Sequence, residues 1–97
     1  MRRCYLVIYD VREPKRLRRV HKVCKGFGEA WQFSVFFCSL REIDRVRLQT
    51  DLECEMNLKE DQVMLIDLGA DEDKAREAAE VIGQARQDPP TSGMLVI

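Results

Sequence analysis

Tyr5-Leu6-Val7-Ile8-Tyr9-Asp10 is the stretch that decides the fold of this 97-residue chain. Its uninterrupted apolar and aromatic residues, including the β-branched Val7 and Ile8, are typical of a strand rather than a helix. An apolar strand so close to the start of the chain is predicted to lie in the centre of a sheet. The run ends on a carboxylate, Asp10, where the strand is expected to stop.

A cationic segment follows Asp10 directly. It holds Arg12, Lys15, Arg16, Arg18, Arg19, Lys22 and Lys25. A carboxylate at a strand end, next to a cationic helix, is what metal-assisted chemistry on a phosphate backbone would use. Asp also begins turns and caps helices, and from these residues alone both interpretations of Asp10 stay open.

Length and composition predict one domain of a globular protein. No apolar run approaches the roughly 20 residues that a membrane helix needs. The first residues, Met1-Arg2-Arg3-Cys4, lead into an apolar run that ends at Tyr9 without a small-residue cleavage site. We therefore expect no signal peptide, no membrane association and a cytoplasmic protein.

The net charge of −1 hides an asymmetry between the two halves of the chain. Residues 1–50 hold 12 Lys and Arg against 5 Asp and Glu, a net of +7, whereas residues 51–97 hold 4 against 12, a net of −8. Nucleic acid is therefore expected on one face only, since the acidic half would repel it. A solvated surface with chance clustering explains the same numbers.

The cysteines and the one histidine are expected to be structural. The cysteines, which are Cys4, Cys24, Cys38 and Cys54, form no C-x-x-C pair and fall in predicted strands and helices, as free buried thiols do. His21 borders the apolar stripe of a helix and is expected to be a packing or surface residue.

The first half of the chain predicts a helix between two extended segments. We expect a helix over about residues 14–25, and the apolar positions Leu17, Val20, Cys24 and Phe27 follow the spacing of one helical stripe. Gly26 is expected to supply a left-handed cap. Residues 29–38 are aromatic and β-branched, which indicates extended structure. They form either one long strand or two short strands joined near residues 32–34.

The second half predicts two more helices and two more strands. Ser39-Leu40-Arg41-Glu42 matches a capping box and opens a helix over about residues 40–56. That helix carries two apolar stripes, Ile43, Val46, Thr50 and Cys54 on one side and Leu48, Leu52 and Met56 on the other. We expect a strand over 62–68 ended by Gly69, a helix over 71–82 closed by Gly83, a loop over 88–93 and a final strand over 94–97.

This order spells β-α-β-β-α-β over residues 1–68, the ferredoxin-like α+β plan. Residues 69–97 add a C-terminal helix, a Pro-containing loop and the final strand to this single domain. In that plan both long helices cover one face of the sheet, so the other face is left bare and apolar. A second copy of the same sheet is expected to cover it, and the final strand is expected to pair with a sheet edge.

The chain resembles the small CRISPR-associated nuclease family that partners the CRISPR integrase, the Cas-two family. The resemblance runs over about residues 4–68, with a terminal strand beyond. The stretches that carry it are Tyr5-Leu6-Val7-Ile8-Tyr9-Asp10-Val11, Lys15-Arg16-Leu17-Arg18-Arg19-Val20, Gly26-Phe27-Gly28 and Gln32-Phe33-Ser34-Val35-Phe36.

The resemblance implies a homodimer whose sheets meet face to face, with the final strand added to the partner's sheet. It also implies that Asp10 binds a divalent metal, usually Mg²⁺, near its symmetry mate, for cleavage of phosphodiester bonds in RNA or duplex DNA. In spacer acquisition, part of antiviral defence, members serve as a scaffold between integrase dimers. The segment from about 71 to 90 is longer than a minimal member needs.

Several residues are candidates for supporting roles at such a site. Arg16, Arg18 and Arg19 would hold phosphates, although a solvated helix face explains each of them equally well. Tyr9 and Ser34 are candidates for the surroundings of the metal, and Ser34 is also explained as a structural hydroxyl.

Two main functions stay open at this point. One is a metal-dependent endonuclease, and the other is a non-catalytic adaptor that binds duplex DNA and the integrase. A third hypothesis is an RNA-binding module that stacks bases on Trp31, Phe33 and Phe36, and a fourth is a regulatory subunit that binds no nucleic acid.

Overall fold

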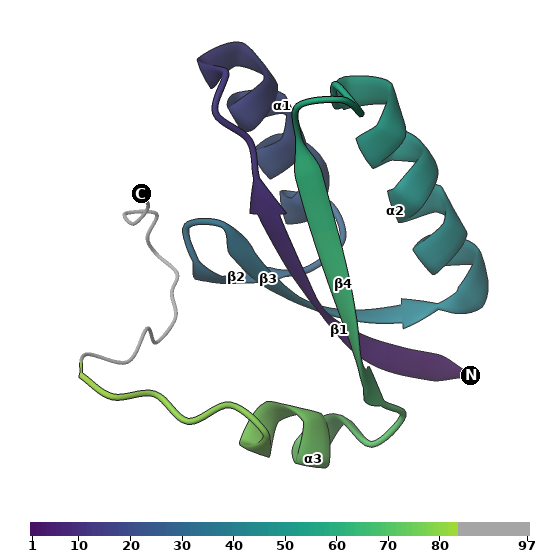
Figure 1. Ribbon diagram of the computed structural model, residues 1–97. Helices are drawn as coiled ribbons and strands as arrows, with labels where there is room; N and C mark the ends of the chain where they lie inside the picture. Colours follow the sequence, from purple (N-terminus) through teal and green to yellow (C-terminus); the bar gives the residue numbers. More distant parts are fainter. Residues whose placement is uncertain (84–97) are drawn as a thin grey trace.

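The computed structural model describes residues 1–83, and within them the ferredoxin-like order is present (Figure 1). The strands are β1 (Arg2–Asp10), β2 (Glu29–Gln32), β3 (Val35–Arg41) and β4 (Gln62–Gly69), and the helices are α1 (Pro14–Lys25), α2 (Glu42–Glu55) and α3 (Glu72–Glu77). The predicted loop over 88–93 and strand over 94–97 lie outside the described residues.

The strand that opens the chain lies in the centre of the sheet, as predicted. The sheet order is β2-β3-β1-β4, and β1 pairs antiparallel with β3 on one side and β4 on the other. The 29–38 segment is divided, because β2 ends at Gln32 and β3 begins at Val35. Of the two alternatives left open by the sequence, the pair of short strands is therefore the right one.

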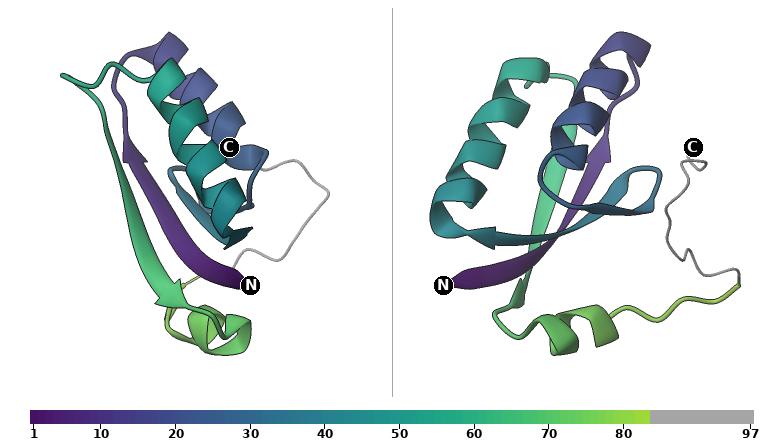
Figure 2. Two further views of the ribbon diagram at one scale, coloured as in Figure 1. Left: turned by 90° about the vertical axis from the view of Figure 1, so that its right-hand side faces the viewer. Right: turned by 180° about the vertical axis from the view of Figure 1, so that it is seen from behind.

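Both long helices cover one face of the sheet, which Figure 2 shows edge-on. Alternate residues of β1, including Val7 and Tyr9, point to this face and pack with Val20 and Cys24 of α1 and with Leu48 of α2. The predicted apolar stripe of α1 is thereby confirmed. On α2 one predicted stripe enters the core, whereas Ile43 and Val46 of the other stripe are more than half exposed.

Helix α1 starts as predicted and ends without the expected left-handed cap. Pro14 is its first residue, and the Glu13 side chain accepts a hydrogen bond from Arg16 N at 2.8 Å. Gly26 has φ −75°, a right-handed conformation, so the prediction of a left-handed cap is wrong. Gly28 is needed for a different reason, since a Cβ there would lie 2.4 Å from Cys38 Sγ and from the Phe37 carbonyl oxygen.

The predicted capping box at residues 39–42 is wrong. Ser39 lies inside β3, opposite Cys4 of β1, and α2 begins only at Glu42, with Arg41 at the cap position and no side-chain capping bond. Pairing with the central strand extends β3 through residues that favour a helix start in isolation, because the longer pairing adds ladder hydrogen bonds and Leu40 becomes buried.

The third helix is shorter than predicted and packs on the other face of the sheet. It ends at Glu77 rather than at residue 82, and Asp71 caps its start by accepting a hydrogen bond from Lys74 N. Its one buried residue, Ala75, lies against Cys4 and Phe37. The two alanines that follow provide little apolar surface to hold a longer helix. Helix α3 thus covers one end of a face that was expected to be bare.

Most, but not all, of the cysteines are buried. Cys4, Cys24 and Cys38 are buried free thiols, whereas Cys54 is exposed on α2. No helix among residues 1–83 is long and apolar enough to cross a membrane.

Candidate active site

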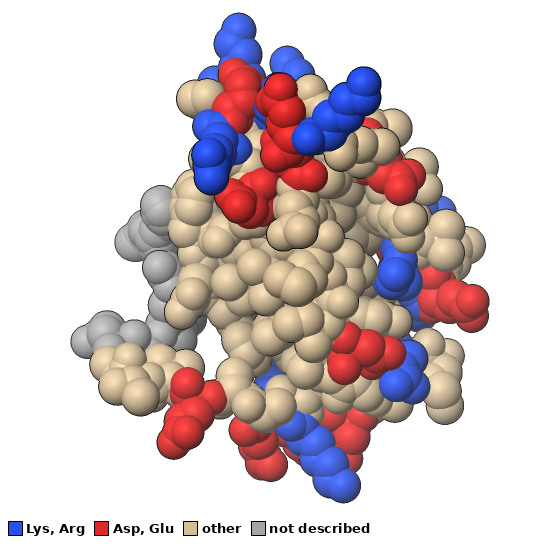
Figure 3. Space-filling view, viewed as in Figure 1, with Lys and Arg blue, Asp and Glu red and all other residues tan. Residues whose placement is uncertain are grey.

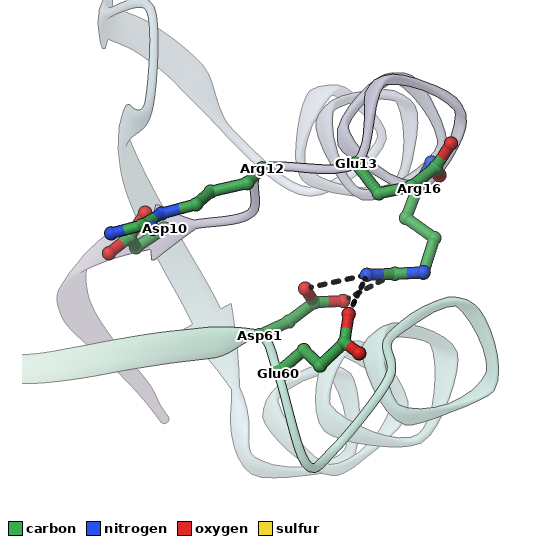
Figure 4. A pocket seen from close by; sticks show the side chains of 6 residues that line it. All are labelled: Asp10, Arg12, Glu13, Arg16, Glu60 and Asp61. Carbon is green, nitrogen blue, oxygen red and sulfur yellow. Dashed lines mark hydrogen bonds and ion pairs between the residues drawn. The ribbon is translucent and has the colours of Figure 1, made fainter.

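Asp10 is exposed at the very end of the central strand, on the rim of a shallow hollow of about 350 Å³. Figure 4 shows the six residues that line the hollow. They are Asp10 and Arg12, Glu13 and Arg16 at the start of α1, and Glu60 and Asp61 just before β4. The hollow therefore forms where the end of β1, the start of α1 and the start of β4 meet.

Asp10 differs from the other carboxylates of the hollow in how it is engaged by the residues that the structure describes. Glu13 accepts from Arg16 N, Glu60 pairs with Arg16 Nη2 at 3.0 Å, and Asp61 pairs with Arg16 Nε at 2.8 Å. Among residues 1–83 the Asp10 side chain makes no hydrogen bond or ion pair. Its oxygens are thus available to a ligand, and its role as a turn or helix cap is not supported, because Glu13 caps α1.

Asp61 organises the hollow, although no pattern in the sequence singles it out. Its side chain is 1% exposed, and its carboxylate accepts from Arg16 Nε and from Asn57 N, both at 2.8 Å. The Arg16 guanidinium, with help from the Asn57 N–H, holds the pKa of Asp61 below its usual range. Asp61 thus joins the segment before β4 to α1, and only long-range contacts could reveal this.

The three predicted phosphate-binding arginines lie in different surroundings. Arg16 turns into the hollow, is engaged by two carboxylates, and its side chain is only 22% exposed. Arg18 and Arg19 are exposed on α1 and make no ion pair among residues 1–83. Arg19 lies beside Lys22 and Glu55 in a shallow groove next to α2. Arg18 and Arg19 therefore remain available for phosphate, whereas Arg16 already has acidic partners.

Tyr9 points away from Asp10. It is buried on the helix-covered face, where its hydroxyl donates to the Phe33 carbonyl oxygen at 2.9 Å and lies 2.6 Å from His21 Nδ1. Burial raises the pKa of this phenol. Because consecutive strand residues face opposite sides of the sheet, the prediction that Tyr9 lies around a metal at Asp10 is not supported by its position.

Ser34 lies in the turn between β2 and β3, beside the end of β1. Tyr9 N donates to its carbonyl oxygen at 3.1 Å, so the Ser34 backbone continues the pairing of β1 up to the residue before Asp10. This backbone contact agrees with a structural part for Ser34. Its part in a metal shell stays a prediction.

The carboxylates that the structure describes do not make a metal cage by themselves. Among residues 1–83 there is no group of three or more His, Cys, Asp or Glu side chains that could hold an ion. Magnesium in proteins is commonly held by one or two carboxylates, together with substrate phosphates and water. Asp10 provides one exposed carboxylate of the kind that holds Mg²⁺ at such sites.

Asp10 shares its face of the sheet with an exposed apolar patch. Leu6 and Ile8 of β1 and Val35 of β3 are half-buried there, and Met64 and Ile66 of β4 are 48% and 40% exposed. We refer to Leu6, Ile8, Val35, Met64 and Ile66 as the open-face patch. Figure 3 shows this face, with its centre free of charge and charged side chains at both ends.

The fold and the site define a class of protein, a small ferredoxin-like α+β domain with an open apolar sheet face and an exposed carboxylate at the end of its central strand. The model of the CRISPR associated protein Cas2 family matches residues 2–76. The chain belongs to this family, which confirms the resemblance found in the sequence.

Individual relatives agree with this assignment. The chain is 37% identical over 92 residues to "CRISPR-associated endoribonuclease Cas2 1" of Rhodospirillum rubrum, covering 95% of this chain and 89% of the relative. It is 39% identical over 69 residues to "CRISPR-associated endoribonuclease Cas2" of Geobacter sulfurreducens, covering 71% and 73%. Among solved structures, Streptococcus pyogenes Cas2 superposes with a TM-score of 0.74 at 32% identity, over 82% of this chain and 99% of that one. The predicted fold class is thereby confirmed.

Proposed function

We propose that this chain is a CRISPR spacer-acquisition protein that acts as a metal-dependent endonuclease on RNA, in the form of a homodimer. The endoribonuclease names of its relatives support RNA as the substrate. The observation that carries the proposal is the free Asp10 carboxylate, which stands on the open face beside the open-face patch. A protein of this kind works where the CRISPR array is, in the cytoplasm.

We infer a homodimer because a second copy would both cover the open-face patch and bring a second Asp10 carboxylate. An apolar sheet face is stabilised when it is covered, and two identical faces related by a twofold axis cover each other. The same arrangement places two copies of Asp10 on facing sheets. Two carboxylates, with phosphate oxygens and water, suit the coordination that Mg²⁺ prefers.

In such a dimer, different residues of the chain would bind the metal, bind the phosphates and maintain the shape of the hollow. Asp10 from each copy would hold Mg²⁺, which supplies an activated water and stabilises charge on the phosphate when it is bound. Arg18 and Arg19 of α1 would hold neighbouring phosphates without regard to sequence. Arg16, fixed by Asp61, would keep the start of α1 against the start of β4 and so maintain the shape of the hollow.

Replacing Asp10 tests this proposal. Purified Asp10→Ala protein should lose at least about 100-fold of its Mg²⁺-dependent cleavage of single-stranded RNA, because a ligand of the metal is removed. Glu60→Gln is the matched control, since it removes one carboxylate from the same hollow and should leave cleavage within about threefold. Cleavage by Asp10→Ala equal to that of the parent would exclude Asp10 as the metal ligand.

A second function is supported by the distribution of charge. The exposed cations of α1 face away from the sheet, and the second half of the chain is acidic, so one surface suits duplex DNA and another a cationic partner such as the integrase. In this adaptor role Asp10→Ala would still assemble with integrase and duplex DNA and support spacer acquisition. Loss of assembly in a folded Asp10→Ala protein would argue against the adaptor.

A further inference from the structure

Phe33 stands out among the aromatic residues because about half of its surface is exposed. Phe36 is 0% exposed on the helix-covered face, and Trp31 lies flat on Phe37, with ring centroids 4.9 Å apart and planes at 9°. Phe33, at the tip of the turn between β2 and β3, is 49% exposed. Of the three aromatics that the sequence suggested for base stacking, the structure presents Phe33 most openly.

The Phe33 ring is held in place by a layered support. It stacks on the His21 ring, with centroids 5.4 Å apart and planes at 19°, and His21 in turn meets the buried Phe36 ring edge-on at 5.3 Å. The Tyr9 hydroxyl contacts His21 Nδ1 and also donates to the Phe33 carbonyl oxygen. Side chain and backbone of Phe33 are therefore both fixed, so stacking another ring on it costs little ordering.

Two cations flank this stack along α1. Arg18, His21 and Lys25 follow the i, i+3, i+7 spacing of one helix stripe, and both cations are exposed. Burial, and to a smaller extent the Lys25 ammonium, lowers the pKa of His21, so the ring under Phe33 is neutral near pH 7. An aromatic surface between two cations matches a base between two phosphates of one strand.

The stack also lies close to the candidate metal ligand. Tyr9 N donates to the Ser34 carbonyl oxygen at 3.1 Å, so the residue after Phe33 lies against the residue before Asp10. A strand that passes around the end of β1 would therefore meet Phe33 on one side of the sheet and Asp10 on the other.

We propose that Phe33, backed by His21, is a stacking platform for one unpaired base of the strand that is bound at Asp10, with Arg18 and Lys25 contacting its phosphates. This site rests on the proposed nuclease function and adds a subsite to it. An unpaired base has a free face to stack, whereas a base inside a duplex does not. The platform thus favours single strands and tolerates any base.

The test measures binding rather than cleavage, so that it can fail independently of the nuclease proposal. Every protein carries Asp10→Ala, and the buffer contains EDTA. The probe is a single-stranded RNA in which 2-aminopurine replaces one base at successive positions. Phe33→Ala and Phe33→Leu should weaken binding about 5- to 100-fold and abolish fluorescence quenching at the stacked position. Phe33→Trp, which restores an aromatic face, should bind within about threefold of Phe33.

Duplex RNA of the same sequence is the second arm. The Phe33 substitutions should change duplex binding less than about twofold, because phosphate contacts alone remain. Equal binding of the single strand by Phe33→Leu and by the parent would overturn the proposal, as would an equal loss for single strand and duplex. Phe33→Leu keeps an apolar side chain of similar size, so the comparison holds even if Phe33→Ala does not fold. If the parent protein, with Asp10 intact, cut no RNA, the nuclease proposal would be refuted. The binding result for Phe33 would still hold.

Discussion

At the scale of single residues, most carboxylates around the hollow already have a hydrogen-bond or ion-pair partner, whereas Asp10 has none among residues 1–83. Asp10 could be chosen from the sequence, because an acid that ends an apolar strand is a visible pattern. Asp61 could not, since its partner Arg16 lies 45 residues away in the chain and no motif joins the two. The same contact explains why Arg16, which looked equivalent to Arg18 and Arg19, has a different environment.

Asp61 gives a prediction for stability. Asp61→Ala should lower the free energy of unfolding by about 1–3 kcal/mol, because the Asn57 N–H loses its acceptor and a guanidinium loses its partner. Chemical denaturation followed by circular dichroism measures this. Glu60→Gln, at a side chain that is 67% exposed, is the control and should cost less than about 1 kcal/mol.

The effect should depend on pH in a defined direction. The folded-state pKa of Asp61 is depressed, so its contribution is present above the unfolded pKa of about 3.9 and is lost as the pH falls through the folded value. The difference between the parent and Asp61→Ala should therefore be constant near pH 7 and shrink below about pH 4. A difference that grows as the pH falls would contradict this assignment.

At the scale of elements, the strong periodic segments were predictable and the element ends were not. The central strand and α1 follow from patterns within the segments themselves. The start of α2 and the length of α3 depend on which neighbours they meet. Helix α3 is held by Arg76, whose guanidinium lies 4.4 Å from the Phe37 ring centroid and pairs with Glu29 and Glu72. None of these contacts is visible in the sequence of residues 71–82, over which a longer helix was expected.

Removing this attachment should loosen α3 without affecting the sheet. Arg76→Ala should increase amide hydrogen exchange over residues 72–78 by about fivefold, which corresponds to about 1 kcal/mol of lost cation–π and ion-pair stabilisation. Exchange in β1 and β3 should stay as in the parent. Lys74→Ala, a substitution of another exposed cation on the same helix, should change exchange less. Equal effects of the two substitutions would show that Arg76 is not the attachment.

At the scale of the whole molecule, the open-face patch is the basis of our proposal that two copies together form the active site. The sequence indicated a bare apolar face, and the structure shows α3 covering one end of it, which leaves the end nearer Asp10 for a partner. The second copy that covers the open-face patch would then also supply the second Asp10 carboxylate. Dimerisation and cleavage should therefore be lost together.

Ile66→Asp tests this link. Because of the twofold symmetry, the substitution would bury two carboxylates in the apolar interface, one from each copy and close to each other. The dimer dissociation constant should therefore rise at least about 100-fold. Ile43→Asp is the matched control, because Ile43 is also exposed, at 57%, but lies on α2 behind the sheet. Sedimentation velocity should show monomeric Ile66→Asp and dimeric Ile43→Asp, and only the monomer should lose RNA cleavage. A monomeric Ile66→Asp that cleaves RNA like the parent would show that one chain holds a complete site.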